Sequence, residues 1–236
     1  MNKHKLILLS LAALAASGVV SCTTVTKDTA TMTKQSQSAT TPAQALQKLK
    51  DGNARFVAGR PSHRDHIRQV HDTAAGQHPF ASVVSCIDSR TGTELIFDQG
   101  IGDVFTARVA GNIVNRDIIG SLEFASKVAG SKVIAVIGHT KCGAVKGACD
   151  HVKLGNLTGL LEKIEPAVDS TPSAKGEDRS SKNGAFVDRV AEQNVRRTIA
   201  AIRSQSHVLR DMEKRGEINI TGGMYDVATG RAAFFE

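Results

Sequence analysis

Two short segments carry the residues of this chain that are best suited to metal chemistry. The first is residues 85–90, with the sequence SCIDSR, and the second is residues 139–143, with the sequence HTKCG. Together they offer the thiols of Cys86 and Cys142 and the imidazole of His139, and Zn²⁺ binds sulfur and nitrogen ligands in a tetrahedron. Three protein ligands leave a fourth position for water, which is the arrangement of a catalytic zinc rather than a structural one.

The elements that must position these residues are predicted from the apolar pattern. Residues 80–85 and 132–137 are apolar runs that predict buried strands, and each ends just before one of the two segments. Residues 104–109 predict a third strand, and helical patterns cover 118–129, before Gly130, and 142–152. This alternation predicts an α/β fold with a central, mostly parallel β-sheet flanked by helices. Open sheets of this kind bind ligands at the carboxyl ends of their strands, so we expect the two segments to meet there.

The flanking regions extend the same domain. A helix is predicted to start at Thr41, which is followed by Pro42 and by Gln44 in the capping-box position. Residues 170–184 are polar and predict a surface loop rather than a domain boundary, because too little chain follows for a second core. The last segments predict two helices and then a C-terminal antiparallel hairpin or edge strand, over residues 186–202, 208–214, 218–225 and 232–235.

The N-terminus predicts export. A short basic start precedes the apolar residues 6–16, which are too few to span a bilayer comfortably, so residues 1–21 are predicted to be a signal peptide. Cys22 follows a small residue, as in a bacterial lipobox, and we expect lipidation at Cys22 with anchoring to the outer membrane; an ordinary secretory signal is the alternative. Residues 22–40 are polar and predict a flexible tether, with the catalytic domain over residues 41–236.

Composition restricts the partners. The 236-residue chain has a formal net charge of +7, and 41% of its residues are hydrophobic, which suits one globular domain. Its basic residues are dispersed without interleaved aromatic residues, so we expect no nucleic-acid partner and read the charge as favouring solubility.

The motifs resemble those of the β-class carbonic anhydrases. The resemblance covers residues 41–236 and rests on Cys-x-Asp-x-Arg, His-x-x-Cys-Gly, the intervening residues 108–112 (RVAGN) and the closing residues 225–230 (YDVATG). Membership implies one Zn²⁺ bound by Cys86, His139 and Cys142, and the reversible hydration of CO₂ to bicarbonate and a proton by zinc-bound hydroxide. It also implies a homodimer or a higher even oligomer, with the active site near the subunit interface.

Asp88 and Arg90 are expected to act as a pair. A carboxylate two residues after a ligand could itself fill the fourth zinc position, but Arg90 lies on the same side of an extended segment and can hold it by paired hydrogen bonds. Asp88 can then accept a hydrogen bond from the zinc-bound hydroxide and orient it toward CO₂. A surface salt bridge is the alternative reading. Because two thiolates and one imidazole form a neutral zinc unit, we also expect activity to rise with pH above roughly 7.

Two further residues are predicted to bind substrate. In plant-like members of the family a Gln at the spacing of Gln77 donates a hydrogen bond to a substrate oxygen; otherwise Gln77 is an ordinary loop residue. Gly143 starts a predicted helix, where its N–H could support a bicarbonate oxygen, or it could be needed only for close approach of the chain. Cys149 is predicted to be a buried small hydrophobic residue.

Two other functions remain open at the sequence level. The same scaffold and zinc could hydrolyse carbon disulfide or carbonyl sulfide, since the shape of the access channel selects among small linear molecules. Alternatively, Cys86 and Cys142 could form a disulfide in a non-catalytic surface binding or redox module. Asp88, Arg90 and His139 favour the enzyme, because a disulfide needs none of them.

Overall fold

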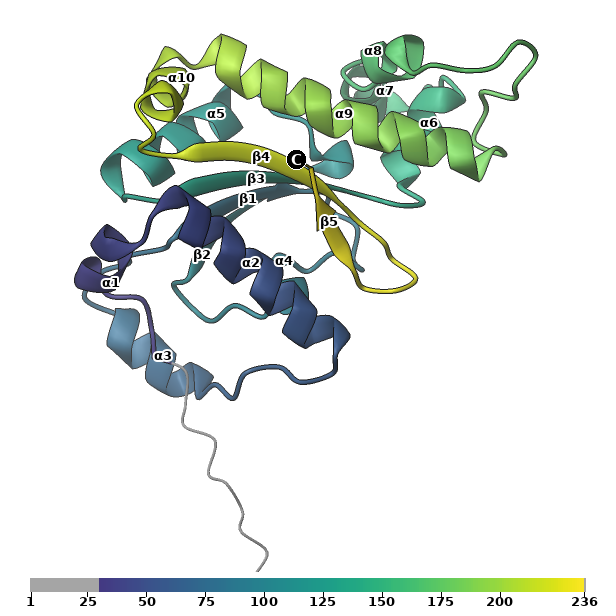
Figure 1. The fold of residues 1–236 in the computed structure, drawn as a ribbon. Coiled ribbons are helices and arrows are strands. Elements are labelled where there is room, and N and C mark those ends of the chain that lie inside the picture. Colours follow the sequence, from purple (N-terminus) through teal and green to yellow (C-terminus); the bar gives the residue numbers. More distant parts are fainter. Residues whose placement is uncertain (1–29, 236) are drawn as a thin grey trace, which may run out of the picture.

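The apolar runs predicted as strands form one five-stranded sheet in the computed structural model, which describes residues 30–235 (Figure 1). The strands are β1 (Ala81–Ser85), β2 (Val104–Arg108), β3 (Val133–His139), β4 (Asn219–Tyr225) and β5 (Ala232–Phe234). Their spatial order is β2-β1-β3-β4-β5; the first four are parallel and β5 runs antiparallel to β4. The predicted fold class, including the C-terminal antiparallel pair, is confirmed.

The centre of the sheet is buried on both faces, which explains its nearly continuous apolar sequence. All residues of β1 and β3 are buried. Successive side chains of β1 face opposite sides, so Val83 belongs to one core and Val84 to the other. In the parallel register Ser85 lies opposite Ile137, and β1 and β3 therefore end close together.

Helix α9 (Gly184–Gln205) covers one face, together with α5 (Arg116–Glu123) and α10 (His207–Lys214) (Figure 1). Two glycines let α9 approach the sheet closely. A Cβ atom at Gly138 would lie 2.6 Å from Val195 Cγ2, and one at Gly222 would lie 2.5 Å from Val195 Cγ1. Val195 is completely buried, so a larger side chain at either position would push α9 off the sheet.

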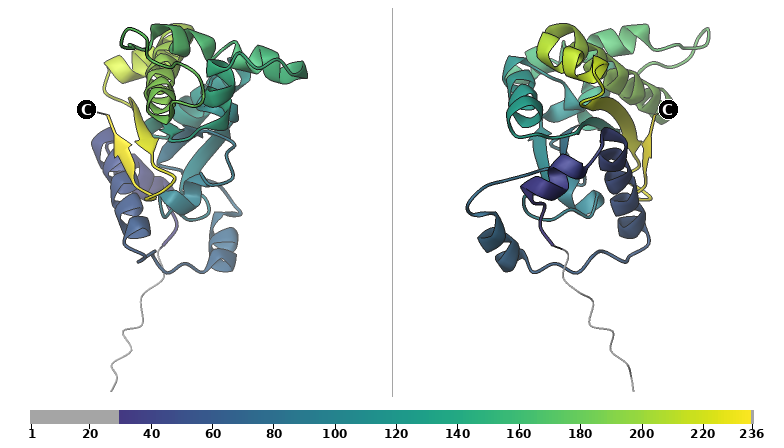
Figure 2. Two further views of the ribbon diagram at one scale, coloured as in Figure 1. Left: turned by 90° about the vertical axis from the view of Figure 1, so that its right-hand side faces the viewer. Right: turned by 60° about the vertical axis from the view of Figure 1, so that its left-hand side comes forward.

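Helix α2 (Pro42–Val57) packs on the opposite face, as the two further views make plain (Figure 2). The predicted capping box is present: Thr41 Oγ1 accepts a hydrogen bond from the Gln44 N–H, and Gln44 Oε1 accepts one from the Thr41 N–H. Ala45 and Leu49 are fully buried in a core with Phe80 and Phe97. Shorter elements complete the fold: α1 (Lys34–Ala39), α3 (His66–Thr73), α4 (Thr93–Ile96), a 3₁₀ turn (Ala110–Asn112), a π-helical turn (Phe124–Val128), α6 (Gly143–Cys149), α7 (Gly155–Leu161) and α8 (Glu165–Ser170).

Ordered structure begins before Thr41, and this differs from the predicted tether over residues 22–40. Residues Lys34–Ala39 form α1, capped by Thr33. Gln37 is 5% exposed, and its Nε2 donates hydrogen bonds of 2.7 Å to the carbonyl oxygens of Pro79 and Ala129. These polar contacts attach a segment that has too little apolar surface to be predicted as folded.

The predicted signal peptide and Cys22 lie outside the described residues. Across residues 30–235, no helix is both long enough and apolar enough to span a membrane.

Candidate metal centre

The two predicted metal segments meet at the carboxyl ends of β1 and β3. Cys86 follows β1 directly, His139 is the last residue of β3, and Cys142 is the residue that precedes α6. All three side chains are buried, and their ligand atoms lie within 4.8 Å of one another. Among residues 30–235 this is the one group of three or more potential metal ligands, so the histidines around α3 form no second group of that kind.

The orientation of His139 fits a metal ligand. His139 Nδ1 lies 2.9 Å from the carbonyl oxygen of Thr140, which requires the proton on Nδ1 for a hydrogen bond. His139 Nε2 then carries a lone pair, and it is buried with no hydrogen-bond partner within residues 30–235. A buried unpartnered nitrogen beside two thiols is the arrangement that a Zn²⁺ ion would satisfy.

The two thiols differ in their tendency to ionise. The neighbouring Cys142 thiol lowers the pKa of Cys86 to about 4, and His139 and the Gly111 N–H act in the same direction, although burial opposes this. The neighbouring Cys86 and burial raise the pKa of Cys142 above its usual range. Because Zn²⁺ binds thiolates, metal binding at this pair must release the thiol protons that remain on it.

The backbone N–H of Gly111 donates a hydrogen bond to the Cys86 sulfur atom. This N–H lies 3.4 Å from Cys86 Sγ, and the Gly111 φ of 69° is in the left-handed region. A Cβ atom at Gly111 would lie 2.4 Å from Ile164 Cδ1. Both the conformation and the contact require glycine at this position.

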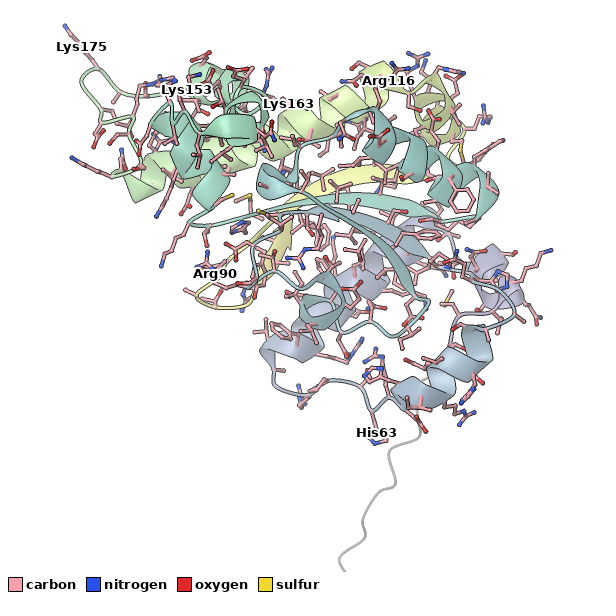
Figure 3. All side chains as sticks on the ribbon, turned by 180° about the vertical axis from the view of Figure 1, so that it is seen from behind. His63, Arg90, Arg116, Lys153, Lys163 and Lys175 are labelled. Atoms are coloured by element: carbon pink, nitrogen blue, oxygen red, sulfur yellow. The ribbon has the colours of Figure 1, made fainter. Side chains whose placement is uncertain are left out.

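Arg90 clamps the carboxylate of Asp88 beside the cluster. Arg90 Nε donates to Asp88 Oδ1 at 2.9 Å and Arg90 Nη2 donates to Asp88 Oδ2 at 2.7 Å, while the Arg90 backbone N–H donates to Oδ1. This contact holds the pKa of Asp88 well below its usual range. Asp88 Oδ2 also lies 3.9 Å from His139 Nε2, so the carboxylate borders the position that a metal would occupy. Arg90 is half exposed at the edge of the site, near the strand pair β4 and β5 (Figure 3).

Arg108 and Thr91 fix the backbone that carries Cys86 and Asp88. Arg108 Nε donates to the Cys86 carbonyl oxygen at 2.9 Å, and Arg108 Nη2 donates to the Asp88 carbonyl oxygen at 2.6 Å. The buried Thr91 hydroxyl donates to the same two carbonyl groups. The sequence marked Arg108 only as part of a family motif and did not identify Thr91, because each acts by a tertiary hydrogen bond to a backbone carbonyl group.

Asp188 supports the second metal segment. The backbone N–H of Lys141 donates to Asp188 Oδ1 at 2.9 Å, and Lys141 adopts a left-handed φ of 57°. This contact from α9 stabilises the strained turn between His139 and Cys142. Sequence reasoning missed Asp188, because it lies far from the motif along the chain.

The two predicted substrate-binding residues have different positions. Gln77 is exposed before the amino end of β1, whereas Cys86 follows its carboxyl end; four steps of about 3.3 Å along the strand separate these edges. A single chain therefore does not bring Gln77 to the cluster. Gly143 does begin α6 beside Cys142, and a Cβ atom there would meet nothing within 4 Å, so close approach of the chain does not explain this glycine.

The three cysteines of residues 30–235 form no disulfide. Cys86, Cys142 and Cys149 are free and buried. Cys149 packs in the core around α6, as predicted, and burial raises its pKa to about 11. A Cys86–Cys142 disulfide is not formed, and the two thiols instead flank His139.

Comparisons with known proteins agree with this geometry. The family model for carbonic anhydrases matches residues 81–232. Carbonic anhydrase 2 of Mycobacterium tuberculosis is 36% identical over 199 residues, which is 82% of this chain and 92% of the relative. The carbonic anhydrase of Mycolicibacterium smegmatis is 37% identical over 193 residues, which is 80% of this chain and 91% of the relative.

Solved structures lead to the same class. The crystal structure of the β-carbonic anhydrase CafA of Aspergillus fumigatus matches with a TM-score of 0.64 and 30% sequence identity, and the match covers 82% of this chain and 90% of CafA. The cluster of Cys86, His139 and Cys142 supplies the ligands for the zinc on which this class depends. The chain therefore belongs to the β-class carbonic anhydrases, zinc enzymes that reversibly hydrate CO₂ to bicarbonate and a proton.

Proposed function

We propose that this carbonic anhydrase uses Asp88, held by Arg90, to orient the attacking group toward CO₂. The observation that carries the proposal is the clamp itself: Arg90 binds both oxygens of Asp88, and Oδ2 still lies 3.9 Å from His139 Nε2. Cys86, His139 and Cys142 would hold the Zn²⁺, which would supply a nucleophile near neutral pH by lowering the pKa of water to about 7.

The protonation state of Asp88 defines its part in the reaction. Its pKa lies well below the usual range, so the carboxylate is ionised at neutral pH and accepts a hydrogen bond rather than storing a proton. The acceptor at Oδ2 directs one proton of the nucleophile away from the incoming carbon atom. Arg90 prevents Asp88 from moving into the open metal position, since both of its oxygens are already hydrogen-bonded.

A direct test measures CO₂ hydration by stopped flow on the zinc-loaded chain and on the same chain stripped of zinc. We expect rapid hydration with about one zinc per chain, and loss of activity on stripping that is restored by adding zinc. Carbonyl sulfide and carbon disulfide are assayed in parallel, because the same centre could attack them. If either sulfur compound is turned over faster than CO₂, CO₂ is not the preferred substrate of this enzyme.

The chain is further proposed to act as a homodimer or a higher even oligomer. Strand β2 is an edge of the sheet, and beside it lies a cavity of about 540 Å³ between β2, α5 and the π-helical turn. Phe124 in this turn is 50% exposed, which favours cover by a second copy. Gln77 could reach substrate only in such an assembly. Light scattering on the wild type and on Phe124→Glu tests this, and a monomeric wild type would contradict it.

Export and lipidation at Cys22 are proposed from the sequence alone. The expected location is the cell envelope, with a lipid anchor in the outer membrane. Metabolic labelling with a radioactive fatty acid and membrane fractionation test this for the wild type and Cys22→Ser. Label and membrane association that persist in Cys22→Ser would contradict lipidation at this residue.

A further inference from the structure

A second hollow lies on the α9 side of the sheet, apart from the metal ligands. Its volume is about 460 Å³, within the range of small-molecule sites. It is an open hollow bordered by the start of α5, the segment between α7 and α8, and one side of α9. Its lining residues are Ile113, Val114, Asn115, Arg116, Lys163, Asn194, Arg197, Thr198, Ala201 and Gln205.

Three cations from three separate elements surround this hollow. Arg116 comes from α5, Lys163 from the segment before α8, and Arg197 from α9, and the lining contains no carboxylate. Within the part of the chain described by the structure, none of the three forms an ion pair. A hollow of this volume is roughly 10 Å across if spherical, close to the screening length of about 8 Å at physiological ionic strength, so the three charges act on the same space. Figure 3 shows Arg116 and Lys163 on the same upper side of the molecule.

The floor of the hollow is polar and held in place. Asn194 is 2% exposed, and its Nδ2 donates to the Gly111 carbonyl oxygen at 2.7 Å. Thr198 is 5% exposed, and its hydroxyl donates to the Asn112 carbonyl oxygen at 3.3 Å. At the side, Asn115 Oδ1 accepts the Ile118 N–H at the start of α5. These contacts hold the floor of the hollow in place before any ligand arrives, which lowers the entropic cost of ordering that part of the site.

The neighbouring arginine on α9 has different surroundings. Arg196 donates to Glu192 at 2.7 Å, and its guanidinium lies 4.2 Å from the centre of the Phe235 ring. Arg196 lines another groove, which also contains Arg203 and Phe235. Of these two adjacent arginines on α9, Arg196 forms an ion pair with Glu192, whereas Arg197 forms no ion pair within residues 30–235 and lines the hollow.

We propose that this hollow is a binding site for a small phosphate-bearing anion. Two guanidinium groups and an ammonium match a phosphate group, which carries close to two negative charges at neutral pH and accepts forked hydrogen bonds from arginine. Bicarbonate has a single charge and uses the three cations less fully. The volume leaves space beside the phosphate for an organic remainder, so a phosphate monoester fits better than the inorganic ion. This site lies outside the hydration reaction and does not depend on the role of Asp88.

Isothermal titration of the zinc-loaded full chain tests the proposal, with inorganic phosphate, glycerol phosphate and bicarbonate as probes at physiological ionic strength. We expect saturable binding of both phosphates, with glycerol phosphate tighter and bicarbonate weaker. Arg197→Gln should weaken phosphate binding roughly tenfold, as expected for the loss of a charge-assisted contact. Arg196→Gln makes the same change in charge one residue away, and it should leave affinity within twofold of the wild type.

Several results would overturn the proposal. These are no saturable binding of either phosphate by the wild type, equal weakening by Arg197→Gln and Arg196→Gln, and bicarbonate binding more tightly than phosphate. Phosphate bound at the metal centre instead would inhibit hydration to the same extent in both variants, and this also counts against the hollow. Hydration by Arg197→Gln in the absence of phosphate should equal that of the wild type, which verifies that the variant is folded.

Discussion

Two Asp–Arg contacts in this molecule use the same chemistry in different surroundings. Asp88 pairs with Arg90 at the edge of the metal centre, where the Asp88 side chain is 16% exposed and the Arg90 side chain is 50% exposed. Asp98 pairs with Arg55 and Arg64 beneath α2, where its side chain is 3% exposed. In each case the arginine contacts lower the pKa of the carboxyl. For Asp98 burial is the largest single influence and raises the pKa, but the contacts with Arg55, Arg64 and Ser62 together lower it.

The difference lies in how the carboxylate oxygens are used. Asp98 is bound by Arg55, by Arg64 and by both the N–H and the hydroxyl of Ser62, so several donors from distant segments converge on it. Asp88 Oδ2 accepts from Arg90 alone and still faces His139 Nε2. An aspartate saturated by its neighbours joins segments of the fold, whereas one with remaining acceptor capacity at a metal centre can act on a substrate.

The largest expected effect is the loss of hydration in Asp88→Asn. Asparagine keeps the shape but presents an amide in place of a charged acceptor, so kcat/KM should fall about 10²–10³-fold, as when a group that acts on the transition state is removed. Zinc content should remain near one per chain, and the free energy of unfolding should change by about 1 kcal/mol, since the Arg90 side chain of this ion pair is 50% exposed to solvent. Stopped-flow hydration, metal analysis and urea unfolding measure these three quantities. Activity within threefold of the wild type would reduce Asp88 to a surface salt bridge.

Asp98→Asn should produce the opposite pattern. It leaves Arg64, whose side chain is 7% exposed, without its buried counter-charge, and such a loss costs about 3 kcal/mol of folding free energy. Hydration per folded, zinc-loaded chain should remain within twofold of the wild type, because Asp98 contacts no metal ligand. Urea unfolding beside the hydration assay separates the effects. A large fall in specific activity with unchanged stability would remove the distinction between the two aspartates.

The two contacts also differ in how far the sequence reveals them. Asp88 and Arg90 are two residues apart and follow a strand, so their spacing alone predicts that they meet near Cys86. Asp98 and its partners come from segments that no periodic pattern connects. The supports at Thr91 and Asp188 likewise depend on tertiary contacts, because the motif does not specify which distant side chain reaches a carbonyl oxygen or an N–H group.

The N-terminal boundary shows the same limit. Residues Lys34–Ala39 lack an apolar stripe, so the sequence predicts a tether; the helix is instead attached by the hydrogen bonds of Gln37. In contrast, the strands and α9 have strong apolar patterns, and their positions were predictable. Apolar periodicity identifies helices and strands that bury apolar side chains. It does not identify elements that are held in place by polar contacts.

A smaller effect is expected for Arg90→Gln. The variant retains the carboxylate and the backbone N–H contact to it, but it loses both guanidinium contacts. We therefore expect kcat to fall about tenfold, and Arg90→Lys should recover part of the loss through a single contact. The double variant Asp88→Asn/Arg90→Gln should be no worse than Asp88→Asn, because Arg90 acts through Asp88. Stopped-flow assays at equal zinc content on the wild type, Asp88→Asn, Arg90→Gln and the double variant complete the cycle, with Arg90→Lys assayed beside them. Additive losses in the double variant would mean that Arg90 has a separate role, such as contact with bicarbonate.

The smallest effect concerns stability in acid. The pKa of Asp98 is lowered in the folded state, so its contribution to stability is complete above the unfolded value of about 3.9 and is lost as the pH falls through the folded value. The difference in Tm between the wild type and Asp98→Asn should therefore be constant from pH 7 to pH 5 and should shrink toward pH 3. Calorimetry of both proteins at equal ionic strength measures this difference, and zinc loss in acid affects both alike because Asp98 contacts no metal ligand. A difference that stays constant down to pH 3 would mean that Asp98 stabilises the fold by the shape of its hydrogen bonds and not by its charge.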